Sequence, residues 1–271
     1  YSFDPVARTP AERVDLCMRG RTAAACQQRR GQRQQRRAEG LPEPRAPQQP
    51  HVRGTLAGKE AAFESLAKRL HRRDPAGRKR LVVLLDGAAA LETQLRARLE
   101  AHGLLARVEA FIGDLWHVGE YLWEAGTALF GATHPERKRW VEDQLRALLH
   151  GRVGRVIGGL RQRVTKGRLR PAQRRALDKA ITYFRNHRHM MAYHTYLARG
   201  YPTPTGVVEG ACNSLVNDRM EQSGMRWSAT GAEAMLQQRA VKHNGDWEDF
   251  WAYYMAAERR RLYPHAAKVA A

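Results

Sequence analysis

The hydrophobic pattern of this chain divides into a stretch that alternates between strand and helix periods and a longer stretch that is helical throughout. Leu81 to Leu85 is an unbroken apolar run, leucines recur at every fourth position from Leu91 to Leu99, and Arg107 to Ile112 is again strand-like. Short apolar runs are typical of buried strands, whereas a four-residue repeat is typical of a helix. Strand, helix and strand in this order predict a largely parallel element covered by helices, and hence an α/β fold.

Downstream of Asp114 the periodicity is helical only. We predict helices over 114–131, 135–150, 152–165, 171–198, 207–222, 229–243 and 246–261. Pro135 and Pro171 stand near two of the predicted helix starts. In the last helix, aromatic side chains recur at helical spacing from Trp247 to Tyr254, and this stripe predicts a face buried in the core.

The region upstream of the strands is predicted to begin with a helix and a linker. Thr9, Pro10 and Glu12 have the spacing of a capped helix start, so a short helix should run to about Gly20. The residues from 27 to 50 are largely Gln, Arg and Pro, which cannot bury enough apolar surface to fold. We therefore expect a basic, disordered linker there.

Two further elements are expected around the linker. A short strand over 51–57 should precede a helix over 59–70, whose apolar residues have helical spacing. At the start of the chain, Tyr1-Ser2-Phe3 has the pattern of a strand end stopped by Asp4-Pro5. We therefore expect an N-terminal piece of the protein to lie upstream of Tyr1.

The charge of the chain narrows the class of partner. A chain of 271 residues that is 43% hydrophobic can bury a substantial core, so it is not a disordered protein. It carries 47 Lys and Arg against 27 Asp and Glu, for a formal net charge of +20. This surplus favours a polyanion over a small neutral substrate.

Basic residues are concentrated between Gly151 and Leu177, where no acidic residue occurs. They are Arg152, Arg155, Arg161, Arg163, Lys166, Arg168, Arg170, Arg174 and Arg175. A run of charge is commonly just a solvated face, but the absence of compensating acids favours a surface that binds a phosphate backbone.

The cysteines and the hydropathy of the chain indicate the cellular compartment. Cys17, Cys26 and Cys212 are scattered and lack a C-x-x-C partner, which indicates neither a disulfide framework nor a zinc ribbon and fits a reducing cytoplasm. The longest apolar runs are far shorter than a membrane span. We expect a cytoplasmic protein without a membrane partner.

A small set of acidic residues has the spacing of a metal site. Asp86 directly follows the first apolar strand, at the edge where open α/β sheets place functional residues. Asp114 and His117 form an Asp-x-x-His pair after the second strand, and Glu209 stands in the first turn of a later helix. Carboxylates are hard oxygen ligands, so Asp86 and Glu209 could share Mg²⁺ if the fold brings them together.

Each of these residues also has a purely structural interpretation. Asp86 precedes Gly87 in the commonest kind of turn pair, and Asp114 is a favoured helix N-cap. His117 could pack beneath Tyr121 on one helix face, and Glu209 could interact with the helix dipole.

Two further groups of side chains could serve either a structural role or nucleic-acid binding. Arg226 and Trp227 lie in a loop before a helix, where they could contact a phosphate and stack on a base, or where Trp227 could simply anchor the loop. His187, His189 and His194 lack a metal-ligand companion, so we expect them on a helix surface or at nucleic acid.

These motifs together resemble the DDE transposases of bacterial insertion sequences, of the Kra-type, mutator-like group. The matching segments are Val82–Gly87, Asp114–Leu122, Gly206–Cys212 and Ser223–Ser228. They occur in the family's order, and the resemblance extends from Lys59 nearly to Tyr263.

The resemblance implies an RNase H-like fold, incomplete at the N-terminus, with a large all-helical insertion and a helical C-terminal part. The implied parts are an N-terminal region over 1–26, the linker over 27–50, core strands and helices over 51–114, a basic insertion over 115–205 and helices completing the catalytic core over 206–271. Asp86 and Glu209 match the second and third acidic residues of the family and would bind the metal. Asp114 and His117 match its D-x-x-H motif, and the first acidic residue would lie before Tyr1.

The implied activity is Mg²⁺- or Mn²⁺-dependent hydrolysis of a DNA phosphodiester, followed by transfer of the freed strand. The implied partners are double-stranded DNA, as transposon ends and target, and further copies of the chain, in the bacterial cytoplasm at the nucleoid. One alternative is a catalytically inactive transposase remnant that only binds DNA. Another is a basic RNA-binding scaffold in which the acidic residues serve only as caps and turns.

Overall fold

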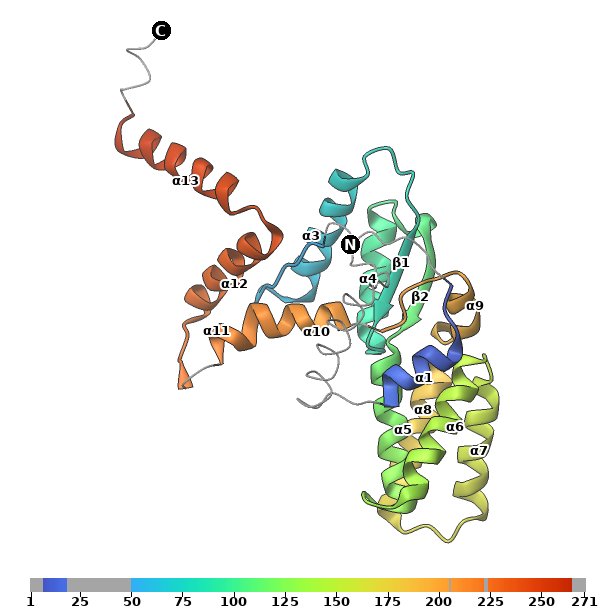
Figure 1. The fold of residues 1–271 in the computed structure, drawn as a ribbon. Coiled ribbons are helices and arrows are strands. Elements are labelled where there is room, and N and C mark those ends of the chain that lie inside the picture. Colours follow the sequence, from blue (N-terminus) through green and yellow to red (C-terminus); the bar gives the residue numbers. More distant parts are fainter. Residues whose placement is uncertain (1–6, 19–49, 205, 222–223, 265–271) are drawn as a thin grey trace, which may run out of the picture. The chain divides into compact units, whose positions relative to one another are not determined.

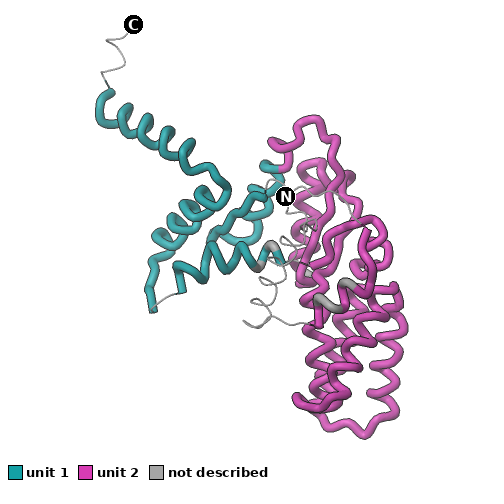
Figure 2. Tube along the Cα trace, viewed as in Figure 1, with its two compact units in different colours: residues 1–3, 47–69, 206–271 teal, residues 4–46, 70–205 magenta. Residues whose placement is uncertain are grey.

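The computed structural model describes residues 7–18, 50–204, 206–221 and 224–264. The chain forms two compact units, which are coloured separately in Figure 2 and described one at a time below. The first unit comprises residues 1–3, 47–69 and 206–271, and the second comprises residues 4–46 and 70–205. The predictions for residues 1–6 and for the linker over 27–49 fall outside the described residues.

The second unit contains a parallel pair of strands. β1 (Leu81–Leu85) and β2 (Val108–Gly113) are joined through helix α4 (Ala89–Ala101) and a short 3₁₀ turn, η1 (Leu105–Arg107). The predicted order of strand, helix and strand is confirmed. Among the described residues these two strands form the whole sheet, and the remaining structure is mostly helical, which is compatible with an α/β class.

β1 departs from its sequence pattern in one respect. Although Leu81 to Leu85 is wholly apolar, only Leu85 is buried, and the other residues of the run are half-buried. Within the described residues, β1 has a strand neighbour on one side only, so it is not a central strand of this sheet.

A bundle of helices continues from the sheet, as Figure 1 shows. Its members are α5 (Leu115–Phe130), α6 (Pro135–Leu149), α7 (Val153–Lys166) and α8 (Pro171–Asn186), with α1 (Pro10–Met18) packed on α5 and α6. The core of the bundle is aliphatic and aromatic, with Leu122, Leu145, Leu160, Leu177 and Phe184 almost inaccessible to solvent. These helices, including the short N-terminal one, confirm the predicted elements.

The prediction of one continuous helix over 171–198 is wrong. α8 ends at Asn186, and a 3₁₀ turn, η2 (Arg188–Met190), leads into a separate helix, α9 (Tyr193–Ala198). The break lets the Tyr193 hydroxyl donate to the Gly113 carbonyl at 2.8 Å and the Tyr196 hydroxyl donate to the Phe111 carbonyl at 3.3 Å. Both carbonyls belong to β2, so tyrosine hydroxyls occupy acceptors that another strand would otherwise use.

The first unit is helical. It contains α3 (Gly58–Arg73) as far as Arg69, where the boundary between the two units falls within the helix. Its other elements are α10 (Gly206–Cys212), a π-helical stretch η3 (Asn213–Asn217), α11 (Asp218–Met220), α12 (Ala229–Asn244) and α13 (Trp247–Leu262). The helices predicted over 59–70, 229–243 and 246–261 are confirmed, and the one over 207–222 is present with a π-helical interruption. The prediction of a buried aromatic face on α13 is wrong, because no residue of this helix is buried.

The prediction of a short strand over 51–57 is wrong. These residues run alongside α12, and helix side chains bind their backbone: Val52 N–H donates to Asn244 Oδ1 at 2.8 Å, and Asn244 Nδ2 donates to the Val52 carbonyl at 3.0 Å. Leu56 N–H donates to Glu233 Oε2 at 2.6 Å. Side chains of one helix therefore satisfy backbone groups that we had expected to pair with a strand.

Candidate functional site

Asp86 and Asp114 follow the two paired strands in the same register. Leu85 pairs with Gly113 in the parallel ladder, and Asp114 N–H donates to the Leu85 carbonyl at 2.7 Å. The next residue on each strand is therefore an aspartate at the carboxyl end of the pair. This position at the edge of the sheet is the one that the sequence predicted for Asp86.

Asp86 forms a turn and still presents its carboxylate to solvent. Its Oδ1 accepts a hydrogen bond from Ala88 N–H at 3.1 Å, which confirms the structural interpretation of Asp86 and Gly87 as a turn. The side chain is nevertheless exposed. The turn fixes the direction of the carboxylate without enclosing it.

Asp114 is an N-cap, as its structural interpretation predicted. Its side chain is 4% exposed and accepts a hydrogen bond from Trp116 N–H at 3.1 Å. The cap starts α5 directly at the end of β2, and His117 lies in the first turn of that helix. Asp114 therefore links the strand edge to the helix that carries His117.

His117 belongs to a cluster of aromatic rings beside this edge. Its ring meets Tyr121 edge-on at 5.4 Å, which confirms the predicted packing, and it meets Tyr183 of α8 edge-on at 5.8 Å. Tyr121 and Tyr183 stack with their ring centroids 3.8 Å apart. His117 Nδ1 lies 3.0 Å from Glu120 Oε2, so a carboxylate orients the imidazole.

Tyr183 is the residue of this cluster that the sequence did not reveal. Its hydroxyl donates to the Asp86 backbone carbonyl at 3.4 Å, across 97 residues of sequence. Burial, together with the nearby Tyr121, Asp114 and Asp86, raises the pKa of the Tyr183 hydroxyl. The hydroxyl therefore stays protonated at neutral pH and remains a hydrogen-bond donor.

No family model, curated protein or solved structure matches the chain. Within the described residues, no group of three or more His, Cys, Asp or Glu side chains is arranged to hold a metal ion. In the same part of the chain, no helix is both long and apolar enough to cross a membrane.

The other predicted metal ligand, Glu209, lies in the first unit. It stands in α10, which begins at Gly206, so its predicted place near a helix start is confirmed. Asp86, Asp114 and His117 all belong to the second unit. The meeting of Asp86 with Glu209 stays a prediction.

In the loop before α12, Trp227 has the structural role that was one of its two interpretations. Its indole N–H donates to the Met220 carbonyl at 3.2 Å, so this side chain anchors the loop. Ser228 caps α12 by accepting from Gly231 N–H at 3.1 Å. Arg226 is exposed beside this anchor, and its contact with DNA stays a prediction.

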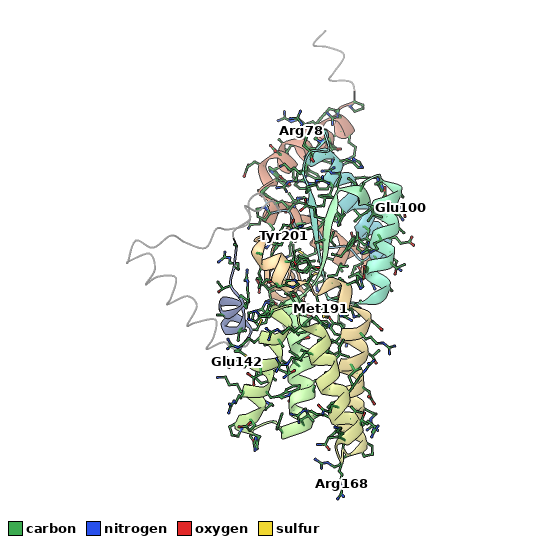
Figure 3. The ribbon with its side chains drawn as sticks, turned by 90° about the vertical axis from the view of Figure 1, so that its right-hand side faces the viewer. Arg78, Glu100, Glu142, Arg168, Met191 and Tyr201 are labelled. Carbon is green, nitrogen blue, oxygen red and sulfur yellow. The ribbon has the colours of Figure 1, made fainter. Side chains whose placement is uncertain are left out.

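The basic segment forms an exposed surface of the bundle. The side chains of Arg152, Arg155, Arg161, Arg163, Lys166, Arg168 and Arg170 are all exposed. Arg155, Arg163 and Lys166 line an open groove of about 720 Å³ together with Trp140 of α6. Figure 3 shows Arg168 at the end of the bundle opposite the sheet, so basic residues extend well away from the strand edge.

Proposed function

We propose that the chain is a DNA strand-transfer enzyme of the DDE transposase type, with Asp86 and Glu209 as metal ligands. The observation that carries this proposal is the pair of aspartates in register at the carboxyl end of the strands, where Asp86 remains exposed. A metal-dependent enzyme of this type holds its ions with carboxylate oxygens, and open α/β sheets place functional residues at such an edge. Cationic side chains would bind the polyanion.

The donor atoms at this edge suit Mg²⁺ or Mn²⁺. Mg²⁺ commonly binds one or two protein carboxylates and completes its shell with water and substrate phosphate oxygens. The exposed carboxylate of Asp86 offers hard oxygen donors of this kind, and the resemblance adds Glu209. A bound pair of such ions would activate the attacking hydroxyl or water and stabilise the leaving oxygen.

The neighbouring side chains have supporting roles in this proposal. His117, oriented by Glu120, would hold the scissile phosphate beside Asp86. Asp114 and Tyr183 act as positioning residues, because the first caps the helix that carries His117 and the second bonds the backbone of Asp86. Neither of these two needs to touch DNA.

The proposed RNase H-like core is consistent with the two edges of the sheet. The outer carbonyls of β2 are bonded to Tyr193 and Tyr196. In the described sheet β1 has a strand neighbour on one side only, so further strands of such a core would pair with its other edge.

The basic bundle would bind the backbone of double-stranded DNA. Arg155, Arg163 and Lys166 converge on one groove, and the segment from Gly151 to Leu177 contains no acid to repel phosphate. Neutralising phosphates releases counterions, so binding should weaken steeply as salt is raised.

The test uses a form of the protein that includes the first acidic residue implied by the resemblance. It compares Asp86→Ala and Glu209→Ala with a control, Asp178→Asn, which changes an exposed carboxylate on α8. Nicking of supercoiled DNA in Mg²⁺ should fall to background in the first two variants and persist in the control. Mn²⁺ binding, followed by electron paramagnetic resonance, should weaken in the same two variants, while salt-dependent DNA binding stays unchanged.

The outcomes separate the candidates. Nicking that survives either alanine substitution would refute the assignment of that residue. A chain that binds DNA but neither cleaves it nor binds Mn²⁺ would be the inactive remnant instead. A preference for RNA with no metal binding would favour the scaffold.

A further inference from the structure

The groove between α6 and α7 has a lining that phosphate binding alone does not explain. Besides its three cationic side chains, it contains Trp140 and Gln144 of α6 and Gly159 and Gln162 of α7. Among the described residues that line it, none is acidic. A phosphate backbone accounts for the cations, so the aromatic ring and the two amides indicate a further part of the ligand.

Trp140 is held by α5 and still reaches the groove. A Cβ built on Gly126 of α5 would lie 3.3 Å from Trp140 Cε3, and the ring centroids of Phe130 and Trp140 are 6.1 Å apart. These contacts give the ring a structural role in anchoring α6. The side chain is nevertheless only half-buried and lines the groove. A fixed, partly exposed indole is a platform on which a nucleic-acid base can stack.

Gly159 leaves space within the groove. It lies in the interior of α7, where glycine is less favourable than alanine. A Cβ there would meet nothing within 4 Å, so packing inside the protein does not require glycine at this position. Arg155 and Arg163 lie four residues before and after it, on the same helix face and about 12 Å apart along the axis. The glycine therefore leaves a gap between two cations.

We propose that this groove binds an unpaired nucleotide, whose base stacks on Trp140 beside Gly159 and whose phosphates contact Arg155 and Arg163. The glutamine amides in the lining both donate and accept hydrogen bonds, as the edge of a base requires. In a duplex the faces of the bases are covered by their neighbours, so only a nucleotide outside a duplex can stack on the indole.

A free nucleotide and a nucleotide within a single strand share this chemistry. The groove is open, and exposed cations continue beyond it to Arg168 at the end of the bundle, which favours a strand (Figure 3). The inference rests on the proposed binding of nucleic acid by the basic bundle. It does not depend on the proposed metal chemistry at Asp86.

The first test uses adjacent glycines as a matched pair. Gly158 and Gly159 are both exposed, and a Cβ at either position would meet nothing within 4 Å, but of the two it is Gly159 that lines the groove. Gly159→Leu should weaken the binding of a single-stranded oligonucleotide to the 271-residue chain about tenfold, as measured by fluorescence anisotropy. Gly158→Leu should leave it unchanged, and duplex binding should change much less in either variant.

The outcomes of this test separate the inference from the proposed function. No loss in Gly159→Leu, or an equal loss for single strand and duplex, would overturn the binding of an unpaired base and leave duplex binding intact as a proposal. A native chain that binds neither form of DNA would refute both.

The second test changes the stacking ring. Trp140→Leu should weaken single-strand binding about tenfold, whereas Trp140→Phe should retain most of it because phenylalanine also stacks on bases. Trp123→Leu, which changes another half-buried indole outside the groove, should bind normally. No charge is removed, so the slope of log affinity against log salt concentration should be the same in all three. Equal losses in Trp140→Leu and Trp140→Phe, with both folded by circular dichroism, would refute stacking.

Competition against a labelled single strand distinguishes the two sources of the nucleotide. Displacement by deoxyadenosine monophosphate at concentrations where inorganic phosphate has no effect would identify a free nucleotide as a ligand. Displacement by oligonucleotides alone would identify a strand. Inorganic phosphate that competes as well as the mononucleotide would show that the base makes no contact, and would overturn the proposal.

Discussion

Replacing Gly87 by alanine tests whether Tyr183 holds the Asp86 turn. Gly87 has φ +88°, and a Cβ built on it would lie 2.7 Å from the Tyr183 hydroxyl oxygen and 2.9 Å from Tyr183 Cε2. A left-handed residue with a side chain costs roughly 1–2 kcal/mol, and overpacking costs typically about 1–3 kcal/mol more. Gly87→Ala should therefore lower the free energy of unfolding by about 2–5 kcal/mol.

Gly103→Ala provides the matched control. Gly103 also has a positive φ, +66°, but a Cβ there would meet nothing within 4 Å. Its substitution should cost only the conformational part, about 1–2 kcal/mol. Urea unfolding followed by circular dichroism gives both values, provided that the slope with denaturant is unchanged.

A double variant completes this prediction. Tyr183→Ala removes the ring that the new methyl group would meet, so Gly87→Ala should cost less in that background than in the native chain, and the difference measures the packing part. Equal costs for Gly87→Ala and Gly103→Ala in the native chain would refute the close packing of Tyr183 on the turn.

Three further predictions concern separate features. Asp114→Ala removes the cap of α5 and should lower the free energy of unfolding by about 1 kcal/mol in chemical denaturation, with no change in DNA affinity. Replacing Arg155, Arg163 and Lys166 together by Gln should make the slope of log DNA affinity against log salt concentration shallower by about 3, as measured by fluorescence anisotropy. An unchanged slope would show that DNA does not bind in this groove. Burial raises the pKa of the Cys17 thiol from 9.0 to about 12, so the protonated thiol stabilises the folded state fully below pH 9, and this stabilisation is lost as the pH rises toward 12. The free energy of unfolding, measured by chemical denaturation, should therefore fall between pH 9 and pH 12, and this fall should be smaller in Cys17→Ala.

The sequence predicted elements whose patterns are local. The apolar run at Leu81–Leu85 and the leucine repeat after it correspond to β1 and α4, because period and length distinguish a strand from a helix within a few residues. Asp86 and Asp114 could be placed at the strand ends for the same reason. A parallel pairing implies that both strands end at the same edge of the sheet, but the pairing of Leu85 with Gly113, and hence the common register of the two aspartates, comes from the structure.

The errors arose where distant parts of the chain decide the structure. The helix break before Tyr193 depends on the Gly113 carbonyl, and the absence of a strand near Val52 depends on the side chain of Asn244. Tyr183 could not be assigned to the site because its partner lies 97 residues away. The aromatic face of α13 was recognised by its period, but periodicity does not say what covers a face.

The tyrosine hydroxyls on β2 also bear on how the second unit folds. Tyr193 and Tyr196 reach β2 across 80 and 85 residues of sequence, and the intervening chain is the helical bundle. Closing so long a loop costs more entropy than forming helices from neighbouring residues. During synthesis, the outer edge of β2 would thus stay open until α9 had left the ribosome, and in that interval it could pair with a strand of another nascent chain.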